Sequence, residues 1–356
     1  MLHNKNFTTY GLLAVVCVVM NCSLFENENE VNTDGIWAES GLQDIHINTL
    51  KYDTGDFLVT TEAGVYKKEA SEFNSIGLTQ FDVGDIVKLE EGAFISVIPS
   101  VSPEGTRDGD TTIYKTEDNG ETWFPFMNNF GGEGEYSFVE KISVDRTNRN
   151  NLFARKSTAV IISRDQGVIW EPRNGPWDAI GGLAGFMYID PFHENMLWAG
   201  GASGLSGPYI FKSEDYGETW DFIEAIGDLS APGGISWDLL TSPKSRNIAM
   251  VGMNGLIRRT TNGGDTWNEV FRGRRAIYTM ERSPRNPNRI YATGFKDEGT
   301  LFFMASNNFG DSWTFVEFKD GPTELYTSDL VAVMENGKEV LYFGTTKGVY
   351  SFTFEK

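Results

Sequence analysis

The sequence predicts an all-β fold, a β-propeller, and two repeated features support this prediction. An eight-residue phrase that ends in tryptophan occurs five times, and the steps between its Asp or Asn positions are 47, 50, 47 and 46 residues. Short apolar runs bounded by Gly, Asn or Pro recur between the copies, which suits four-stranded blades. The Asp or Asn residues are Asp118, Asp165, Asp215, Asn262 and Asn308, and the tryptophans are Trp123, Trp170, Trp220, Trp267 and Trp313.

Each part of the phrase has a turn-forming role, as the copy from Ser213 to Trp220 illustrates. The Asp215 carboxylate can accept hydrogen bonds from nearby backbone amides, and Gly217 can adopt the positive φ that a tight turn needs. The flanking hydroxyls satisfy further amides, and the tryptophan packs underneath as the next strand begins. We therefore expect these residues to be structural.

The length of the chain sets the number of blades. From Gly35 to Lys356 there are 322 residues, and a mean period of about 47.5 divides this length about 6.8 times. The sequence therefore predicts a single seven-bladed propeller over residues 35–356.

The two ends of this region predict how the ring closes. The segment 340–350 resembles the segment 56–66, and both are expected to form two strands joined by a turn. After the later copy the chain stops without a fourth strand. We expect Gly35–Glu39 to supply that strand, with Trp37 in the place of a repeat tryptophan, because this pairing would remove open sheet edges.

The repeated phrase resembles the Asp-box, or BNR repeat, of sialidases, sortilin-type receptors, xyloglucanases and photosystem II assembly propellers. The resemblance covers roughly residues 100 to 320 and implies a fold rather than an activity, because these families share little else. It also implies that the boxes are structural and lie on the face away from the active sites known in those families.

The first 34 residues predict the cellular location of the protein and are not expected to be part of the propeller. Residues 1–21 contain Lys5 and an apolar stretch of ten residues, too short to span a bilayer, and are expected to form a signal peptide. The run that ends at Cys22 resembles a relaxed bacterial lipobox, which implies lipidation of Cys22. Residues 22–34 form an acidic tether similar to the export signals of Bacteroidota surface lipoproteins. We expect an outer-membrane lipoprotein exposed on the cell surface; a periplasm-facing or freely secreted chain is the alternative.

Composition excludes several classes of partner. The net charge of −20 argues against nucleic acid and against anionic membrane surfaces, so contact with a membrane is expected only through the lipid. The two cysteines, one of them in the leader, provide no disulfide framework, and no Cys/His cluster indicates a metal. We expect a monomer with no cofactor.

Candidate ligand-binding residues lie on the face opposite the boxes, where the inner strands begin and several loops are long. Acids at or near the starts of the inner strands are expected to form a ring there, and a solvated channel rim is the alternative. These acids are Asp44, Asp85, Glu140, Asp178, Asp238, Glu281 and Asp329. Trp beside Asp suits sugars, because the ring stacks on the apolar sugar face while the carboxylate accepts hydroxyl protons; tryptophans wedged between blades are the alternative. The candidates are Trp177, Asp178, Trp237, Asp238, Arg173, Arg274 and Tyr278.

These residues favour a non-catalytic, surface-anchored propeller that binds a glycan or an extracellular or periplasmic protein. In this hypothesis Arg173 and Arg274 select an acidic sugar. A sialidase is disfavoured because the Arg-Ile-Pro motif is absent and because Arg272, Arg274 and Arg275 cluster in one loop. The alternative is a glycoside hydrolase or polysaccharide lyase, in which two acids at a set separation act as acid and base.

Overall fold

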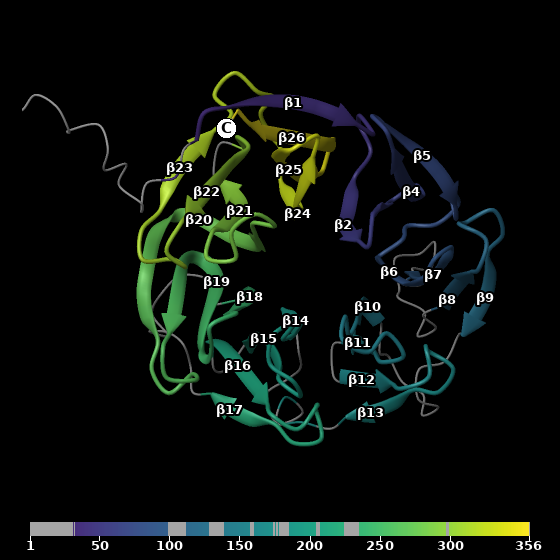
Figure 1. The fold of residues 1–356 in the computed structure, drawn as a ribbon, viewed down its shortest axis with the longest axis horizontal. Coiled ribbons are helices and arrows are strands. Elements are labelled where there is room, and N and C mark those ends of the chain that lie inside the picture. The colour runs from purple at the N-terminus through teal and green to yellow at the C-terminus, as the bar shows by residue number, and fades with distance from the viewer. Residues whose placement is uncertain are drawn as a thin grey trace, which may run out of the picture.

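A computed structural model shows a ring of antiparallel β-sheets around a central axis (Figure 1). It describes residues 31, 33–98, 112–127, 139–156, 160–173, 175, 177, 185–203, 207–223, 235–296 and 299–355. The predicted signal peptide and Cys22 lie outside this range, whereas Val31, at the end of the predicted tether, is buried against the ring. No helix in the described ranges has the length and apolar character needed to cross a membrane.

Five sheets have four strands each, with the first strand nearest the axis. The first two are β2 (Ile47–Asp53), β3 (Asp56–Thr61), β4 (Gly64–Glu69) and β5 (Glu72–Gly77), then β6 (Asp85–Glu90), β7 (Ala93–Ile98), β8 (Thr112–Thr116) and β9 (Phe124–Met127). The next two are β10 (Val139–Val144), β11 (Leu152–Lys156), β12 (Val160–Ser163) and β13 (Glu171–Arg173), then β14 (Phe186–Ile189), β15 (Leu197–Ser203), β16 (Gly207–Ser213) and β17 (Asp221–Ile223). The fifth contains β24 (Thr327–Glu335), β25 (Lys338–Thr345), β26 (Gly348–Phe354) and β1 (Gly35–Gly41).

A sixth sheet has six strands, and it corrects the predicted architecture. Its strands are β18 (Ser236–Ser242), β19 (Ser245–Thr260), β20 (Asn268–Arg282), β21 (Ile290–Lys296), β22 (Phe302–Ser306) and β23 (Thr314–Glu317).

The prediction of seven separate four-stranded blades is therefore wrong: the described ring has five such blades and one larger sheet. The reason lies in β20, which continues through Arg272–Ala276, where the sequence predicted a loop. One half of β20 pairs with β19 and the other half with β21, so backbone pairing is not interrupted where a blade boundary was expected.

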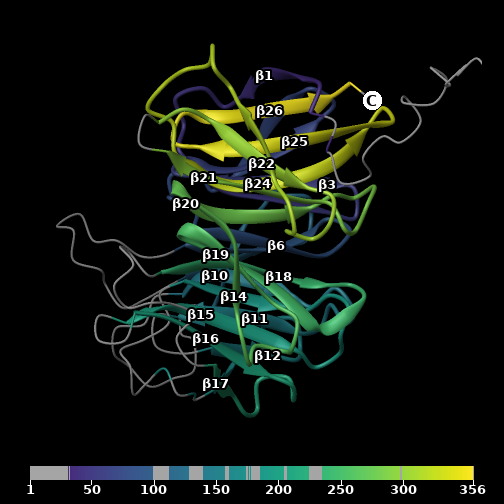
Figure 2. The same cartoon turned by 90° about the vertical axis from the view of Figure 1, so that its left-hand side faces the viewer.

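The predicted closure of the ring by the N-terminal strand is confirmed. Strand β1 pairs antiparallel with β26, and the two strands lie side by side in both views of the ring (Figures 1 and 2). Trp37 of β1 stacks on Phe318, with centroids 5.0 Å apart and planes 2° apart, and meets the ring of Phe352 edge-on at 5.1 Å. Residues from opposite ends of the chain thus share one apolar cluster.

Most of the apolar core lies between neighbouring sheets rather than within one. One cluster, for example, joins Ile95 and Ile113 of one blade to Ile142 and Leu152 of the next. The repeat tryptophan Trp170 packs into the same cluster. Because each sheet has apolar side chains on both faces, every blade depends on its two neighbours to bury them.

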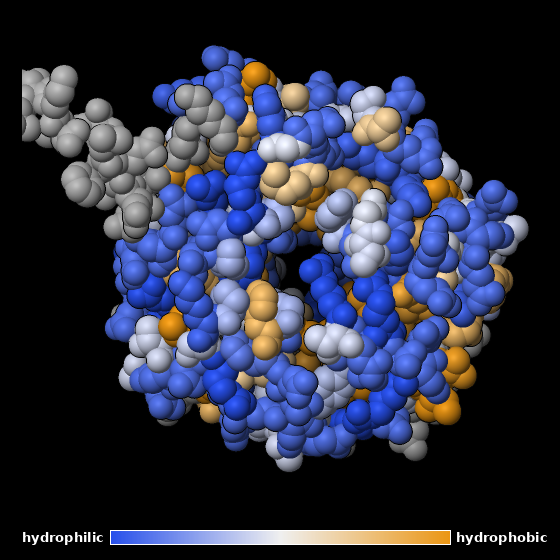
Figure 3. All heavy atoms as spheres, in the orientation of Figure 1, coloured by the Kyte–Doolittle hydropathy of each residue, from blue (hydrophilic) through white to orange (hydrophobic). Residues whose placement is uncertain are grey.

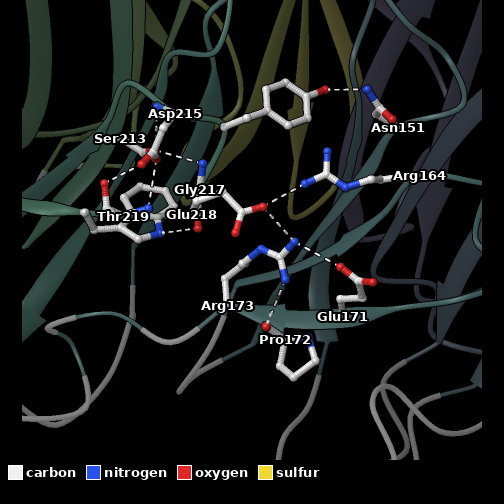
Figure 4. Close-up of polar contacts among 12 residues, drawn as sticks. Asn151, Arg164, Glu171, Pro172, Arg173, Ser213, Asp215, Gly217, Glu218 and Thr219 are labelled. Atoms are coloured by element: carbon white, nitrogen blue, oxygen red, sulfur yellow. Dashed lines mark hydrogen bonds and ion pairs between the residues drawn. The ribbon is translucent and has the colours of Figure 1, made fainter.

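The five repeated turns share one hydrogen-bond pattern. In the copy shown in Figure 4, the Ser213 hydroxyl donates to the Asp215 carboxylate at 2.8 Å and accepts from the Gly217 amide at 2.8 Å. The Thr219 amide donates to the same carboxylate at 2.8 Å. Gly217 has φ +84°, a conformation that favours glycine. The Asp and Asn side chains of all five turns accept a backbone amide in this way.

We predict that Trp37→Ala will lower the free energy of unfolding by about 3 kcal/mol, at the lower end of the range for core Trp→Ala changes because Trp37 is only partly buried. Urea unfolding followed by fluorescence or circular dichroism measures this change. Ile36→Ala is the matched control, since Ile36 precedes Trp37 in the same strand and is 60 % exposed. Equal stabilities of the two variants would show that this contact does not hold the ring closed.

Candidate functional site

The inner strands begin with an irregularity that directs side chains toward one face of the ring. The pairing register shifts between Ser236 and Asp238 in β18, and again between Ile277 and Thr279 in β20. Such β-bulges re-aim the extra residue and are frequent next to functional sites. The two extra residues here are aromatic, Trp237 and Tyr278, and both were predicted as candidates.

These two rings belong to a group of four aromatic residues, which we call the aromatic arc: Trp237, Tyr278, Phe295 and Tyr326. The rings of Trp237 and Tyr278 meet edge-on at 5.0 Å, and those of Phe295 and Tyr326 stack at 4.8 Å. Phe295 of β21 pairs with Ala276 of β20, two residues before Tyr278, so the two pairs are neighbours. Burial, and to a smaller extent Tyr326, raise the pKa of Tyr278. The arc runs over the starts of β18 and β24 and over the bulge in β20, where the half of β20 that pairs with β21 begins.

The arc combines fixed rings with accessible surface. The Trp237 indole nitrogen donates a hydrogen bond to the Asn254 side-chain oxygen at 2.5 Å, which fixes the orientation of the ring. Tyr326 is 45 % exposed, and the other three rings are partly buried. Rings held in this way can offer apolar surface to a ligand without a large loss of side-chain entropy on binding.

Three acids of the predicted ring link neighbouring inner strands, and we call them the carboxylate staples. Each accepts the amide of the next residue with one oxygen and an amide of the adjacent inner strand with the other. Asp85 accepts from Ile86 at 2.9 Å and Ile142 at 3.0 Å. Asp238 accepts from Leu239 at 2.8 Å and Met280 at 2.7 Å. Asp329 accepts from Leu330 and Leu50, both at 2.9 Å.

Asp238 is therefore placed beside the arc but is already occupied by the backbone. Burial raises its pKa to about 7, against the backbone hydrogen bonds, and the charges of Asp329 and Glu281 add to this rise. Burial likewise raises the pKa of Glu281 to about 7. Two carboxyl groups of the channel can thus change charge near neutral pH.

Two lysines lie among these acids in the channel. Lys51 forms an ion pair with Asp85 at 3.4 Å; burial opposes its charge, but the carboxylates of Asp85 and Asp329 outweigh burial and raise its pKa. Burial lowers the pKa of Lys141, whose neighbours include the same two carboxylates. Figure 3 shows an opening at the axis, with hydrophilic residues around most of the viewed face. The channel therefore holds charges of both signs.

The structure does not bring the other predicted site residues to the arc. Trp177 is fully buried between blades, at 5.5 Å from the Phe211 ring and 5.2 Å from the Trp220 ring, so its ring offers no surface to a ligand. Arg173 lies on the outer strand β13, and its guanidinium binds Glu171 and Glu218 at 3.0 and 3.1 Å (Figure 4). Asp178 and the side chain of Arg274 lie outside the described residues.

Phe295 and Tyr326 of the arc were not among the sequence candidates. Phe295 ends strand β21, and Tyr326 precedes β24, so neither stands next to an acid in the sequence. Their stacking joins residues 31 positions apart and depends on how two sheets sit side by side. A search of the described residues finds no group of three or more His, Cys, Asp or Glu that could hold a metal ion.

We predict that, as pH rises from about 4 to 7, the free energy of unfolding decreases more steeply for the wild-type protein than for the Asp238→Asn variant. The folded state holds a proton on Asp238 up to about pH 7, whereas the unfolded state loses it near 3.8, so this group stabilises the fold at low pH and ceases to do so as pH rises. Urea unfolding at pH 5 and pH 7 measures the slope. Asp265→Asn, at an exposed turn, is the control. Identical slopes for all three proteins would contradict the assignment.

Comparison with known proteins supports the fold. No family model matches the chain, and no curated protein matches it by sequence. Among solved structures, the GH74 xyloglucanase from Xanthomonas campestris aligns with a TM-score of 0.65 and 14 % identity over 89 % of this chain and 53 % of the enzyme.

YCF48 bound to D1 peptide aligns with a TM-score of 0.64 and 12 % identity over 92 % of this chain and 98 % of that one. The extracellular domain of a putative one component system from B. thetaiotaomicron aligns with a TM-score of 0.61 and 9 % identity over 89 % of this chain and 40 % of that one. This chain spans about half the length of the GH74 enzymes that it matches. At these identities the likeness identifies a β-propeller fold.

Proposed function

We propose that this protein is a non-catalytic propeller that binds a neutral polysaccharide on the aromatic arc. The observation that carries the proposal is the arc itself, with Trp237 and Tyr278 on β-bulges and Tyr326 exposed at the same end of the inner strands. Aromatic rings pack well against the apolar faces of sugars while leaving the hydroxyl groups in water. The net charge of −20 disfavours a polyanion, so a neutral chain is the better match.

The position of the arc also suits a chain rather than a single sugar unit. Trp237 and Tyr278 lie on β18 and β20, Phe295 lies on β21, and Tyr326 precedes β24, so the arc extends across two sheets, as an extended ligand requires. The GH74 xyloglucanase shares the fold and is named for its action on xyloglucan, which makes xyloglucan a suitable first probe. A peptide is the alternative occupant, since YCF48 is described as bound to one.

We propose a non-catalytic role because the carboxylates of the staples accept hydrogen bonds from backbone amides and hold neighbouring strands together. A glycosidase needs two carboxyl groups free to face the scissile bond at a set separation. Asp238, the acid next to the arc, has both oxygens engaged by backbone amides.

One observation favours a glycoside hydrolase as the second candidate: the pKa values of Asp238 and Glu281 are both raised to about 7, as in many acid catalysts. Release of reducing ends from a polysaccharide, lost in Glu281→Gln, would favour this candidate.

We predict that Trp237→Ala and Tyr326→Ala will each weaken polysaccharide binding roughly tenfold, because each removes a ring from the arc. Affinity electrophoresis and calorimetry with xyloglucan, mixed-linkage glucan, xylan and mannan measure the effect. The matched control is Phe222→Ala, since Phe222 on the outer strand β17 is also 45 % exposed. The proposal fails if the wild type binds none of the four polymers, or if the arc variants bind as the control does.

We further propose that the chain is held at the outer membrane by a lipid on Cys22, with the propeller on the cell surface. The support is the sequence alone, an apolar leader that ends at Cys22 and an acidic segment after it. Metabolic labelling with a palmitate analogue should mark the wild type and leave Cys22→Ser unmarked. Equal labelling of the two proteins would refute the anchor, and protease treatment of intact cells tests surface exposure separately.

A further inference from the structure

A cavity of about 530 Å³ lies between two neighbouring blades, on the face opposite the aromatic arc. The turns β10–β11 and β14–β15 and the turns that follow β12 and β16 surround it. These turns lie at the ends of the inner strands, whereas the arc lies at their starts, which places the two features on opposite faces. Ile189 and Met196 supply an apolar part of the lining, and the remaining walls are mostly polar. Its volume suits a small ligand.

One wall of the cavity carries a fixed Asp–His pair. The Asp190 carboxylate accepts hydrogen bonds from the amides of Phe192 at 2.8 Å and His193 at 3.1 Å, and from His193 Nδ1 at 2.9 Å. Because a carboxylate can only accept, Nδ1 carries the proton, and Nε2 of the neutral ring is free to accept a hydrogen bond. The side chain of His193 is 20 % exposed and that of Asp190 is fully buried, so the pair presents the imidazole to the cavity.

The side chains of the opposite wall are also held by hydrogen bonds and an ion pair. The Tyr216 phenol donates to Asp145 and accepts from the Asn151 amide at 2.8 Å. The Arg164 guanidinium lies over the Tyr216 ring at 5.7 Å. It also binds Glu218 at 2.9 Å, a contact shown in Figure 4. The guanidinium is thus neutralised by Glu218, while Asp145 is satisfied by its hydrogen bonds. This wall presents no unpaired charge.

The rim adds an exposed aromatic ring. Phe192 is 42 % exposed, and the Arg282 guanidinium lies 4.9 Å from its ring centre. The side-chain amide of Asn195, next in the lining, forms no hydrogen bond with any described residue. Apolar ring surface thus stands beside a free acceptor, His193 Nε2, and a free amide.

We propose that this cavity binds one neutral saccharide unit. The ring of Phe192 packs against the apolar face of the sugar, His193 Nε2 accepts a hydrogen bond from one hydroxyl, and the Asn195 amide exchanges hydrogen bonds with another. A neutral ligand fits because Arg164 is paired with Glu218 and Asp190 is held by His193 and a backbone amide, whereas the exposed carboxylate of Glu194, also in the lining, disfavours an anion. The site is independent of the arc, and it could be occupied whether or not a polysaccharide binds there.

The test uses the full chain and five free sugars as probes: glucose, galactose, mannose, xylose and N-acetylglucosamine. Saturation-transfer NMR at millimolar sugar detects weak binding directly. We expect at least one sugar to receive saturation from the wild type, and we expect His193→Ala and Phe192→Ala each to weaken this binding roughly tenfold or more. His46→Ala is the matched control, since it removes an exposed imidazole far along the chain from the cavity.

The arc variant Trp237→Ala separates this proposal from the proposed function. Binding of a free sugar that survives in Trp237→Ala and is lost in His193→Ala supports the cavity, whatever happens to polysaccharide binding. Melting curves of all variants identify any that fail to fold, and for these the conservative changes His193→Gln and Phe192→Leu replace the alanine variants. The inference is overturned if no sugar binds the wild type, if His193→Ala and Phe192→Ala bind as His46→Ala does, or if only Trp237→Ala loses binding.

Discussion

The packing of each sheet against its two neighbours is the constraint on which this structure depends. The apolar clusters join residues of adjacent sheets, so no blade can bury its core alone, and the ring must close. Closure rests on β1, which arrives from the other end of the chain and places Trp37 among the rings of Phe318, Phe343 and Phe352. Without that strand, β26 would be left with an open edge.

Closure also determines what the residues near the axis can do. Inner strands brought side by side leave backbone amides that need acceptors, and Asp85, Asp238 and Asp329 supply them. These carboxylates are therefore largely occupied by holding strands together. The bulge residues, which are not used in this way, include the aromatic rings Trp237 and Tyr278, and our proposal assigns recognition to these rings and not to the acids.

The sequence was sufficient for the propeller fold and for its closure, because both follow from a repeated phrase and a missing strand. It failed at β20, where the glycine-containing segment Arg272–Ala276, expected to form a loop, continues the sheet. It also could not tell whether a carboxylate near the axis faces water or a neighbouring amide, and Asp238 illustrates this limit. Trp177 and Trp237 both precede Asp in the sequence, yet one is buried between blades and the other joins the arc, because contacts between distant residues decide the outcome.

The positions of the two proposed binding sites determine whether one polysaccharide chain can occupy both. The arc follows the starts of β18 and β24 and the bulge in β20, and the cavity lies at the other ends of β10 and β14, so the two sites lie on opposite faces of the ring. Linked sites raise affinity only when the connection can span them. Occupation of both sites would therefore bring two separate saccharide chains to one propeller and would not raise the affinity for a single chain. Free sugars that bind in the cavity should then displace little of a polysaccharide that is bound at the arc.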